Sequence, residues 1–539
     1  MTSPASSSAL RIGRRAPMSS DATSIAPPDN DGSPTLVAAH VLARDRGVVA
    51  SEGAARLALS AALRFVARIV ALPVGALAGL HVGAFAAPAL LFVRTAWVKR
   101  IALCLLSPLL GLYFGLELAL RYLVKGKIDG TALAARAFHA YAPVLTLPKA
   151  LSHQAMGIVL VSGHREVREV LERDDVFRVD MYDARMRELS GQFFLGMDPC
   201  DAYDAERALG AAALGRDHAS LREGIGRIAD ALIEGALARR SRTLDVVTEL
   251  AHPVQLDLLK EYFGVPDTRD ERLIALLETT SFFIFNFWIG GPYRCRAIQA
   301  GTDIAQHLRD LVKERIAAAN EGRTVPNDVL GRMVLHLRNA AAGRPIDEDL
   351  AVRTMSGLVS GATVPTIGTF VQVVDRLLDL PASQRKALRD AALLPKDAVV
   401  RRFVREAARF SAYPPTLYRH AAKPFVFGAG TDHEKEVDEG ALVVTLPILA
   451  NFDARIFPRP EAFDANRDET RETAPLLVGW ARHRCLGEHM AELLLVELVK
   501  RLFAKNVERA PGSAGRLTKG TPGKIPDGDY ARRLIVRFG

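Results

Sequence analysis

One cysteine, Cys485, constrains this chain more than any other residue. It follows an apolar run that ends in a glycine, residues 475–479, and a short cationic stretch, and it stands just before an apolar-periodic segment, 486–503, that predicts a helix. The free N–H groups and the dipole of a helix N-terminus favour the thiolate form of a cysteine, and neighbouring cationic side chains act in the same direction. The sequence therefore predicts a nucleophile or an iron-ligating thiolate, with a buried structural cysteine as the alternative.

A catalytic nucleophile would require a base and an orienting partner, and the sequence shows no local signature of either. The other cysteines, Cys104, Cys200 and Cys295, are scattered singly without a C-x-x-C pair. A zinc site and a disulfide framework are therefore not expected, which fits a reducing compartment. An iron-ligating thiolate agrees better with the loop.

The pattern His483-x-Cys485-x-Gly487 running into a helix resembles the haem-binding loop of the cytochrome P450 family. The resemblance implies that Cys485 is the axial thiolate ligand of haem iron, that Gly487 lets the backbone pass close to the porphyrin, and that His483 faces a propionate. This loop departs from the family pattern at two positions, with Val478 in place of a phenylalanine and Ala481 in place of a glycine. We expect the loss of the aromatic ring to alter the shielding of the thiolate and the iron potential.

Earlier segments extend the resemblance. A strand predicted at 158–162 and a helix at 164–172 look like the first sheet and the following helix of the family. Arg207, on a later predicted helix, matches a basic residue that binds a haem propionate in the family, and Tyr203 takes the place of a frequent histidine. Arg419 matches a second arginine of this kind. An arginine fork suits the geometry of a carboxylate.

Glu406 and Arg409 form an E-x-x-R pair one helical turn apart, so that both side chains lie on the same face. The motif is common by itself, but here it is followed by segments in the order typical of the family. The resemblance implies a buried ion network with a later arginine, Arg467. Removing one member should leave a buried charge unpaired, at a cost of about 3–5 kcal/mol.

A long apolar helix predicted at 355–380 resembles the helix that crosses the distal haem face. In family members that activate dioxygen, a small residue and a glycine are followed by an acid and a threonine that deliver protons. Alignment on Gly361 puts Thr363 at the position of the acid and Val364 at the position of the threonine. Neither residue can take the proton-delivery role of the residue it replaces. Thr363 and Thr366 are candidates to hold a water. The same departure is found in hydroperoxide isomerases and peroxygenases of the family.

The N-terminal part lies outside the resemblance. Residues 1–56 predict a disordered or weakly structured segment, and 57–130 an apolar helical segment that is a membrane anchor or, alternatively, a pair of buried soluble helices. The net charge of +9 suits an anionic membrane surface better than nucleic acid, because the basic residues form no dense tract. We therefore expect no nucleic-acid partner, and a membrane-associated protein whose catalytic domain, 140–539, is cytoplasmic.

Taken together, the motifs predict a mostly α, α+β chain with the cytochrome P450 fold and haem b. The first functional hypothesis is monooxygenation of a hydrophobic, lipid-like substrate. Electrons would come from a separate ferredoxin or flavoprotein reductase, because the chain has no flavin or nicotinamide glycine motif. The second is a hydroperoxide isomerase or peroxygenase that needs no reductase. The third is a haem-binding membrane protein without turnover.

Overall fold

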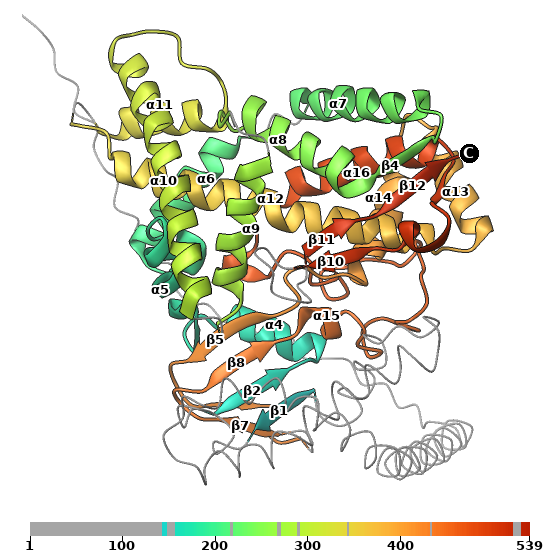
Figure 1. The fold of residues 1–539 in the computed structure, drawn as a ribbon. Helices are drawn as coiled ribbons and strands as arrows, with labels where there is room; N and C mark the ends of the chain where they lie inside the picture. Colours follow the sequence, from blue (N-terminus) through green and yellow to red (C-terminus); the bar gives the residue numbers. More distant parts are fainter. Residues whose placement is uncertain are drawn as a thin grey trace, which may run out of the picture. The chain divides into compact units, whose positions relative to one another are not determined.

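Long helices surround one central helix, and a five-stranded sheet lies at one end of the helical part (Figure 1). The computed structural model describes residues 143–147, 157–215, 219–266, 271–287, 291–341, 344–431, 434–520 and 530–539. The segments 1–56 and 57–130 lie outside these residues, so the membrane anchor stays a prediction.

The five-stranded sheet has the order β1-β2-β8-β5-β3, with β2 parallel to β8 and the other neighbours antiparallel. Strand β2 reads IVLV, and its buried valines pack into the core beneath α4. The strands are β1 Val144–Leu147, β2 Ile158–Val161, β3 Phe177–Arg178, β5 Leu417–Ala421 and β8 Leu442–Thr445, and helix α4 is His164–Glu172. The strand and the helix predicted from the sequence in this region thus agree with the structure to within a residue.

Shorter strands form three small sheets beside the helices. Strands β4 (Thr243–Asp245), β12 (Ile535–Phe538) and β9 (Val507–Arg509) pair in that order, β10 (Thr518–Gly520) pairs with β11 (Tyr530–Arg533), and β6 (Phe425–Phe427) pairs with β7 (Lys435–Val437). The last residues of the chain therefore close a sheet next to the helical part.

The helices make up most of the described chain. They are α5 Asp180–Leu189, α6 Asp201–Leu214, α7 Ala219–Ala238, α8 His252–Glu261, α9 Glu271–Phe285, α10 Gly291–Asn320, α11 Val329–Ala341, α12 Glu348–Leu378, α13 Ala382–Ala392, α14 Ala398–Arg409, α15 Pro447–Ala450 and α16 Glu488–Ala504. Short helical turns are η2 Phe194–Gly196, η3 Val246–Ala251 (a π-helix), η4 Ala481–His483 and η5 Gly512–Gly515.

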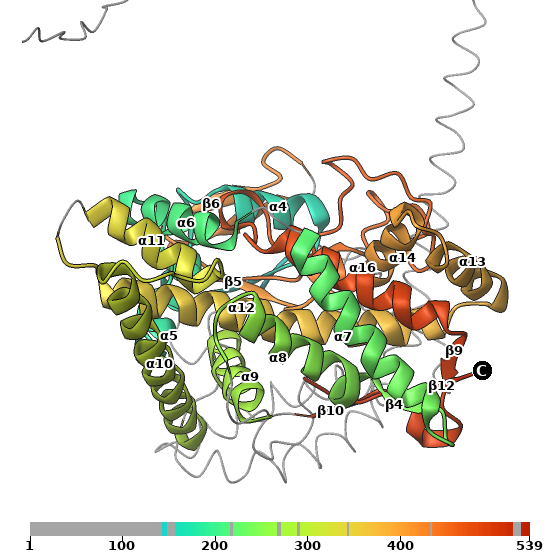
Figure 2. The ribbon, with the colours of Figure 1, turned by 90° about the horizontal axis from the view of Figure 1, so that it is seen from above.

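Helix α12 runs through the middle of the helical part (Figure 2) and packs against α9, α10, α14 and α16. It begins at the cap Asp347, whose carboxylate accepts from the N–H of Leu350 at 2.9 Å, and it continues past Pro365. Among the described residues it is the one helix long and apolar enough to cross a membrane, but 67% of its most apolar window is buried. A helix apolar on most of its faces is typical of a protein core.

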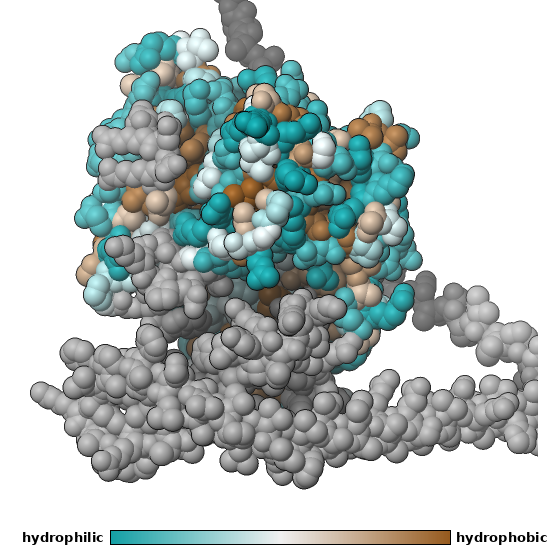
Figure 3. Space-filling model, turned by 45° about the vertical axis from the view of Figure 1, so that its right-hand side comes forward, coloured by the Kyte–Doolittle hydropathy of each residue, from teal (hydrophilic) through white to brown (hydrophobic). Residues whose placement is uncertain are grey.

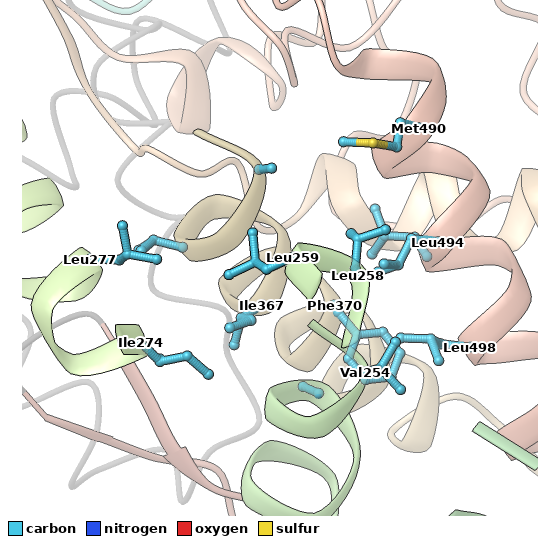
Figure 4. Close-up of a cluster of buried hydrophobic side chains, with 14 of the residues drawn as sticks. Val254, Leu258, Leu259, Ile274, Leu277, Ile367, Phe370, Met490, Leu494 and Leu498 are labelled. Carbon is cyan, nitrogen blue, oxygen red and sulfur yellow. The ribbon is translucent and has the colours of Figure 1, made fainter. Parts of the chain in front are cut away.

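Apolar side chains fix α12 against its neighbours. Leucines and isoleucines of α8, α9 and α16 gather around Ile367 and Phe370 of α12 (Figure 4). On the surface, hydrophilic side chains cover most of the described face in Figure 3, and apolar ones lie between them in small groups. Because the same core holds α16, which follows Cys485, the central helix and the cysteine loop have a fixed mutual position.

Candidate functional site

The loop before α16 holds Cys485 by backbone contacts. Gly479 turns the chain with a φ of +73°, and an added Cβ there would lie 3.3 Å from the carbonyl oxygen of His483. The N–H of Cys485 donates to the carbonyl of Val478 at 2.9 Å. The loop therefore closes on itself, and Cys485 lies just ahead of α16, as the sequence predicts.

The sulfur of Cys485 opens into a cavity. The side chain is accessible although protein atoms surround it closely. Burial raises the pKa of the Cys485 thiol, and the hydrogen bond from the Gly487 backbone N–H opposes this rise. The sequence predicts that the helix N-terminus and the neighbouring cations favour the thiolate, but burial has the larger effect on the pKa of Cys485. Within the protein the thiol is favoured, and a bound metal cation would be needed to stabilise the thiolate.

The cavity has a volume of about 340 Å³ and is mostly apolar. Helix α12 lies along one wall, where an added Cβ at Gly361 would meet no atom within 4 Å. Val478 and Cys485 line it from the cysteine loop. Further lining residues come from α5, α9, α10 and the loop before α6, among them Met186, Leu195, Ile284, Phe285 and Ile304. A flat group placed on the sulfur would thus have open space towards α12.

Arg419 of β5 lines the same cavity and is only 4% exposed. One guanidinium nitrogen donates to the carbonyl of Tyr418 at 2.8 Å, and the buried Nε has no hydrogen-bond partner. Burial lowers the pKa of Arg419. No carboxylate in the described part of the chain forms an ion pair with it. A buried guanidinium without an ion-pair partner can bind the carboxylate of a ligand.

Arg207 and His483 also have unpaired buried nitrogens, although Arg207, unlike His483, does not line the cavity. The Nη2 of Arg207 donates to the carbonyl of Arg484 at 3.1 Å, while its buried Nη1 has no partner. The Nδ1 of His483 is also buried and unpaired. Burial, followed by the charges of Arg419 and Arg207, lowers the pKa of His483 to about 3. His483 is therefore a neutral residue and not a cationic one.

These three unpaired groups come from α6, β5 and the cysteine loop, which are far apart in the sequence. The unpaired buried nitrogens of Arg207, Arg419 and His483 suit the two propionates of a haem, and the accessible sulfur of Cys485 suits its iron. The residues present therefore fit the cofactor that the loop predicts.

Tyr203 occupies a different place from the one expected. Its hydroxyl donates to the carbonyl of Arg482 at 2.6 Å, its ring packs edge-to-face on His483 with 5.2 Å between the ring centroids, and it does not line the cavity. Tyr203 therefore supports the cysteine loop, and its contact with the cofactor stays a prediction. At Gly487, an added Cβ would make only ordinary contacts of 3.8 Å with Cys485 and Met490. The described protein atoms thus do not themselves require glycine there.

The structure also corrects one prediction for α12, the helix expected to cross the distal haem face. Thr363 is fully buried, donates to the carbonyl of Val359 at 2.8 Å, and lies on the side of Gln255, away from the cavity. Two residues span about 200° of a helix, so Thr363 cannot share the face of Gly361. The cavity face consists of Ser356, Gly357, Ser360, Gly361, Pro365, Thr366 and Thr369. Thr366 thus stays a candidate to hold a water and Thr363 does not.

Sequence reasoning missed two features here. The i, i+4 spacing from Gly361 would have identified Pro365 as the residue that faces the cavity one turn later. Asp174 lies 3.9 Å from Nε2 of His483, and burial raises its pKa. An acidic pair at 174–175 is the only sequence signal for it, because the contact joins segments about three hundred residues apart.

The structure brings Glu406, Arg409 and Arg467 together. Arg409 is fully buried and binds Glu406 through two hydrogen bonds, of 2.8 and 2.9 Å. Arg467 reaches the same carboxylate at 3.1 Å. The remaining donors of both arginines bind backbone carbonyls in the segment that precedes the cysteine loop, at Asn451, Pro458, Arg459, Pro460 and Ala462. The network therefore ties α14 to this segment.

We expect Arg419→Met to weaken haem retention by about 10–100-fold, the range for residues that support a bound metal centre. The methionine fills the space of the arginine stem but cannot bind a carboxylate. Haem transfer to an excess of a haem-scavenging protein measures the loss. The control is Arg178→Met on β3, because Arg178 is exposed and does not line the cavity. Equal transfer rates for both variants would contradict the assignment of Arg419.

Ala481 stands where the family has glycine, and it adopts a φ of +51°. The left-handed conformation costs an L-residue about 1–2 kcal/mol. We therefore expect Ala481→Gly to raise the free energy of unfolding by about 1 kcal/mol. The matched control is Ala205→Gly on the exposed face of α6, which should lower it by about 0.5–1 kcal/mol. Urea denaturation measures both, and destabilisation by Ala481→Gly would contradict the expected strain.

The chain is similar in sequence to several known proteins. Cytochrome P450 107B1 of Saccharopolyspora erythraea is 27% identical over 317 residues, which is 58% of this chain and 70% of that protein. The mycinamicin VIII C21 methyl hydroxylase of Micromonospora griseorubida is 24% identical over 67% of this chain and 87% of its own. A bifunctional dioxygenase-epoxy alcohol synthase of Fusarium oxysporum is 23% identical over 67% of this chain but only 30% of its own.

Solved structures show the fold. The crystal structure of P450BioI in complex with hexadec-9Z-enoic acid ligated acyl carrier protein has a TM-score of 0.61 at 17% identity, and the match covers 76% of this chain and 98% of that one. No protein-family sequence model matches the chain. The predicted fold is thus confirmed, and in this chain the cysteine loop borders a cavity beside unpaired buried nitrogens. In sequence the chain is thus similar to cytochrome P450 proteins, and it has the cytochrome P450 fold.

Proposed function

We propose that the protein is a haem b monooxygenase that acts on a hydrophobic, lipid-like molecule and takes electrons from a separate redox partner. In this reaction one oxygen atom of dioxygen enters a C–H bond and the other leaves as water, at the expense of two electrons and two protons. The observation that carries the proposal is the accessible sulfur of Cys485, which faces an apolar cavity and is flanked by unpaired buried nitrogens. Bound haem would supply the iron that activates oxygen.

The chain's own residues would bind and orient the substrate. Apolar side chains of α5, α9 and α10 exclude water from the cavity, and Gly361 leaves room beside α12. The hydroxyl of Thr366 lies on the cavity face of α12 and is the candidate to hold a water for proton delivery. The P450BioI complex, which holds an acyl chain on its carrier protein, supports a lipid-like substrate.

Isotopically labelled dioxygen tests the proposal. The reconstituted holoenzyme is given a long-chain fatty acid or its ester, a ferredoxin and a ferredoxin reductase. We expect one labelled oxygen atom in the product and none when the electron donor is left out. Label-free product, or product formed equally well without electrons, would contradict dioxygen-dependent monooxygenation.

A second candidate function is the rearrangement or use of a hydroperoxide without a reductase. The supporting observation is that no residue of α12 on the cavity side is acidic, so that the usual acid of the proton relay has no counterpart there. The similarity to a protein named as an epoxy alcohol synthase points the same way. Stopped-flow mixing with a fatty-acid hydroperoxide decides between the two: rapid turnover without any electron donor supports this candidate, and its absence argues against it.

The third hypothesis, a haem protein without turnover, is less well supported, because an open apolar cavity beside the sulfur is a place for a substrate. Membrane association and a cytoplasmic catalytic domain stay proposals that rest on residues 57–130. Cell fractionation tests them: the full chain should sediment with membranes, and a chain without residues 1–130 should not.

A further inference from the structure

We propose that Ser190 and Ser356 form a polar subsite in the cavity, which selects hydrophobic substrates that carry a neutral hydrogen-bond acceptor. This inference rests on the proposed function. Ser356 belongs to α12, and Ser190 is the C-cap residue that follows α5. The Ser356 hydroxyl donates to Ser190 Oγ at 2.7 Å, and both residues line the cavity that holds Cys485.

The Ser190 hydroxyl can donate a hydrogen bond to a ligand. A serine hydroxyl has one hydrogen to donate, and Ser356 uses its own on Ser190. The hydroxyl hydrogen of Ser190 has no acceptor among the described residues. Thr280 lines the same cavity, but its hydroxyl donates to the carbonyl of Leu277 at 3.0 Å. An unpaired hydroxyl facing an apolar space is costly until an acceptor pairs with it.

The neighbouring backbone holds the pair in place. The N–H of Ser190 donates to the carbonyl of Met186 at 3.2 Å, and Gly191 follows with a φ of +107°. Arg353 of α12 then donates to the carbonyl of Gln192 at 2.9 Å and pairs with the buried Glu206 of α6. The end of α5 is therefore fastened to the same helix that carries Ser356, so the subsite is built on rigid elements.

The charge of the cavity walls limits the chemistry of the acceptor. The charged residues that line the cavity are Arg405, Arg419, Arg484, Glu488 and Glu492, which lie on α14, β5, the cysteine loop and α16. The described lining residues of α5, α9, α10 and α12 are all uncharged. A carboxylate next to Ser190 would have no cation among these lining residues, and the neighbouring Arg353 is already paired with Glu206, so burying it would be unfavourable. The subsite thus suits a ketone, ester, thioester, ether or hydroxyl oxygen.

The position of the pair determines which carbon would react. Ser356 precedes Gly361 by five residues, which is about 7.5 Å along the helix axis. Gly361 borders the open space that faces the cysteine. A substrate held by its acceptor at Ser190 would therefore place a carbon several bonds away at the reacting position. The pair would determine regioselectivity as well as affinity.

The experiment compares two probes on the holoenzyme, a long-chain methyl ketone and the alkane of the same chain length, by the change in the haem absorption band on binding. A net hydrogen-bond free energy of about 1.4 kcal/mol corresponds to a tenfold change in the dissociation constant. We therefore expect the ketone to bind about tenfold more tightly than the alkane. Ser190→Ala should abolish this preference, and Ser356→Ala should keep part of it. Thr280→Val is the matched control and should keep all of it.

The possible results separate this inference from the proposed function. If the Ser190→Ala variant binds haem normally but still prefers the ketone tenfold, the proposed subsite is wrong. Equal binding of the two probes by the unaltered enzyme, or no binding of the ketone, would overturn it as well. A protein that acquires no haem absorption band at all would contradict the proposed function instead. Product analysis gives a second readout, because Ser190→Ala should spread oxidation over more positions of the ketone chain.

Discussion

Cys485→Ser is expected to lower turnover by more than about hundredfold, because loss of a residue that only supports a metal ligand already costs 10–100-fold. Serine is nearly isosteric with cysteine, so the cavity and the unpaired nitrogens of Arg207 and Arg419 should stay in place. The hydroxyl is not deprotonated at neutral pH and is a poor ligand for haem iron compared with a thiolate. Activity and the electron paramagnetic resonance spectrum of the ferric protein measure the effect.

Cys295→Ser is the matched control for this experiment. Cys295 is exposed on α10 and does not line the cavity, so its replacement should leave activity and spectrum unchanged. Retention of both by Cys485→Ser would mean that the iron ligand is another residue.

Arg409→Met should lower the free energy of unfolding by about 3–5 kcal/mol, because it leaves the buried carboxylate of Glu406 without its main partner. Arg409 also satisfies the carbonyls of Asn451 and Pro460. The variant should lose haem together with its fold, since the segment that contains these carbonyls leads to the cysteine loop. Urea denaturation followed by circular dichroism measures the change.

Arg401→Met on the same helix is the control for the network. Arg401 is 46% exposed and pairs with Glu492 at 3.6 Å, so its loss should cost less than about 1 kcal/mol. Equal effects of the two substitutions would contradict a structural role specific to the buried network.

The parts of this protein that were predictable from sequence are those determined by residues close together in the chain. The cysteine loop, the strand and helix at 158–172, and the pairing of Glu406 with Arg409 follow from local spacing. The position of Thr363 was wrong because the alignment on Gly361 did not take the helical period into account, which places Thr363 about 200° around α12 from Gly361, on the side of Gln255.

The long-range contacts were also beyond sequence reasoning. Tyr203 binds the carbonyl of Arg482, and Ser190 meets Ser356, across 279 and 166 residues of chain. The low pKa of His483 depends on burial and on the nearby charges of Arg419 and Arg207, which only the folded chain brings together. The sequence motifs predicted which residues lie near the cysteine loop. The hydrogen bonds and the charge states of these residues depend on tertiary packing.

The optical spectrum of the ferrous carbon monoxide adduct tests the central claim most directly, namely that the sulfur of Cys485 ligates haem iron. We predict the strongly red-shifted main absorption band that a thiolate ligand produces, and its loss in Cys485→Ser with unchanged haem content. A band at the position given by a nitrogen ligand in the unaltered protein, or a red-shifted band that survives the substitution, would contradict the account.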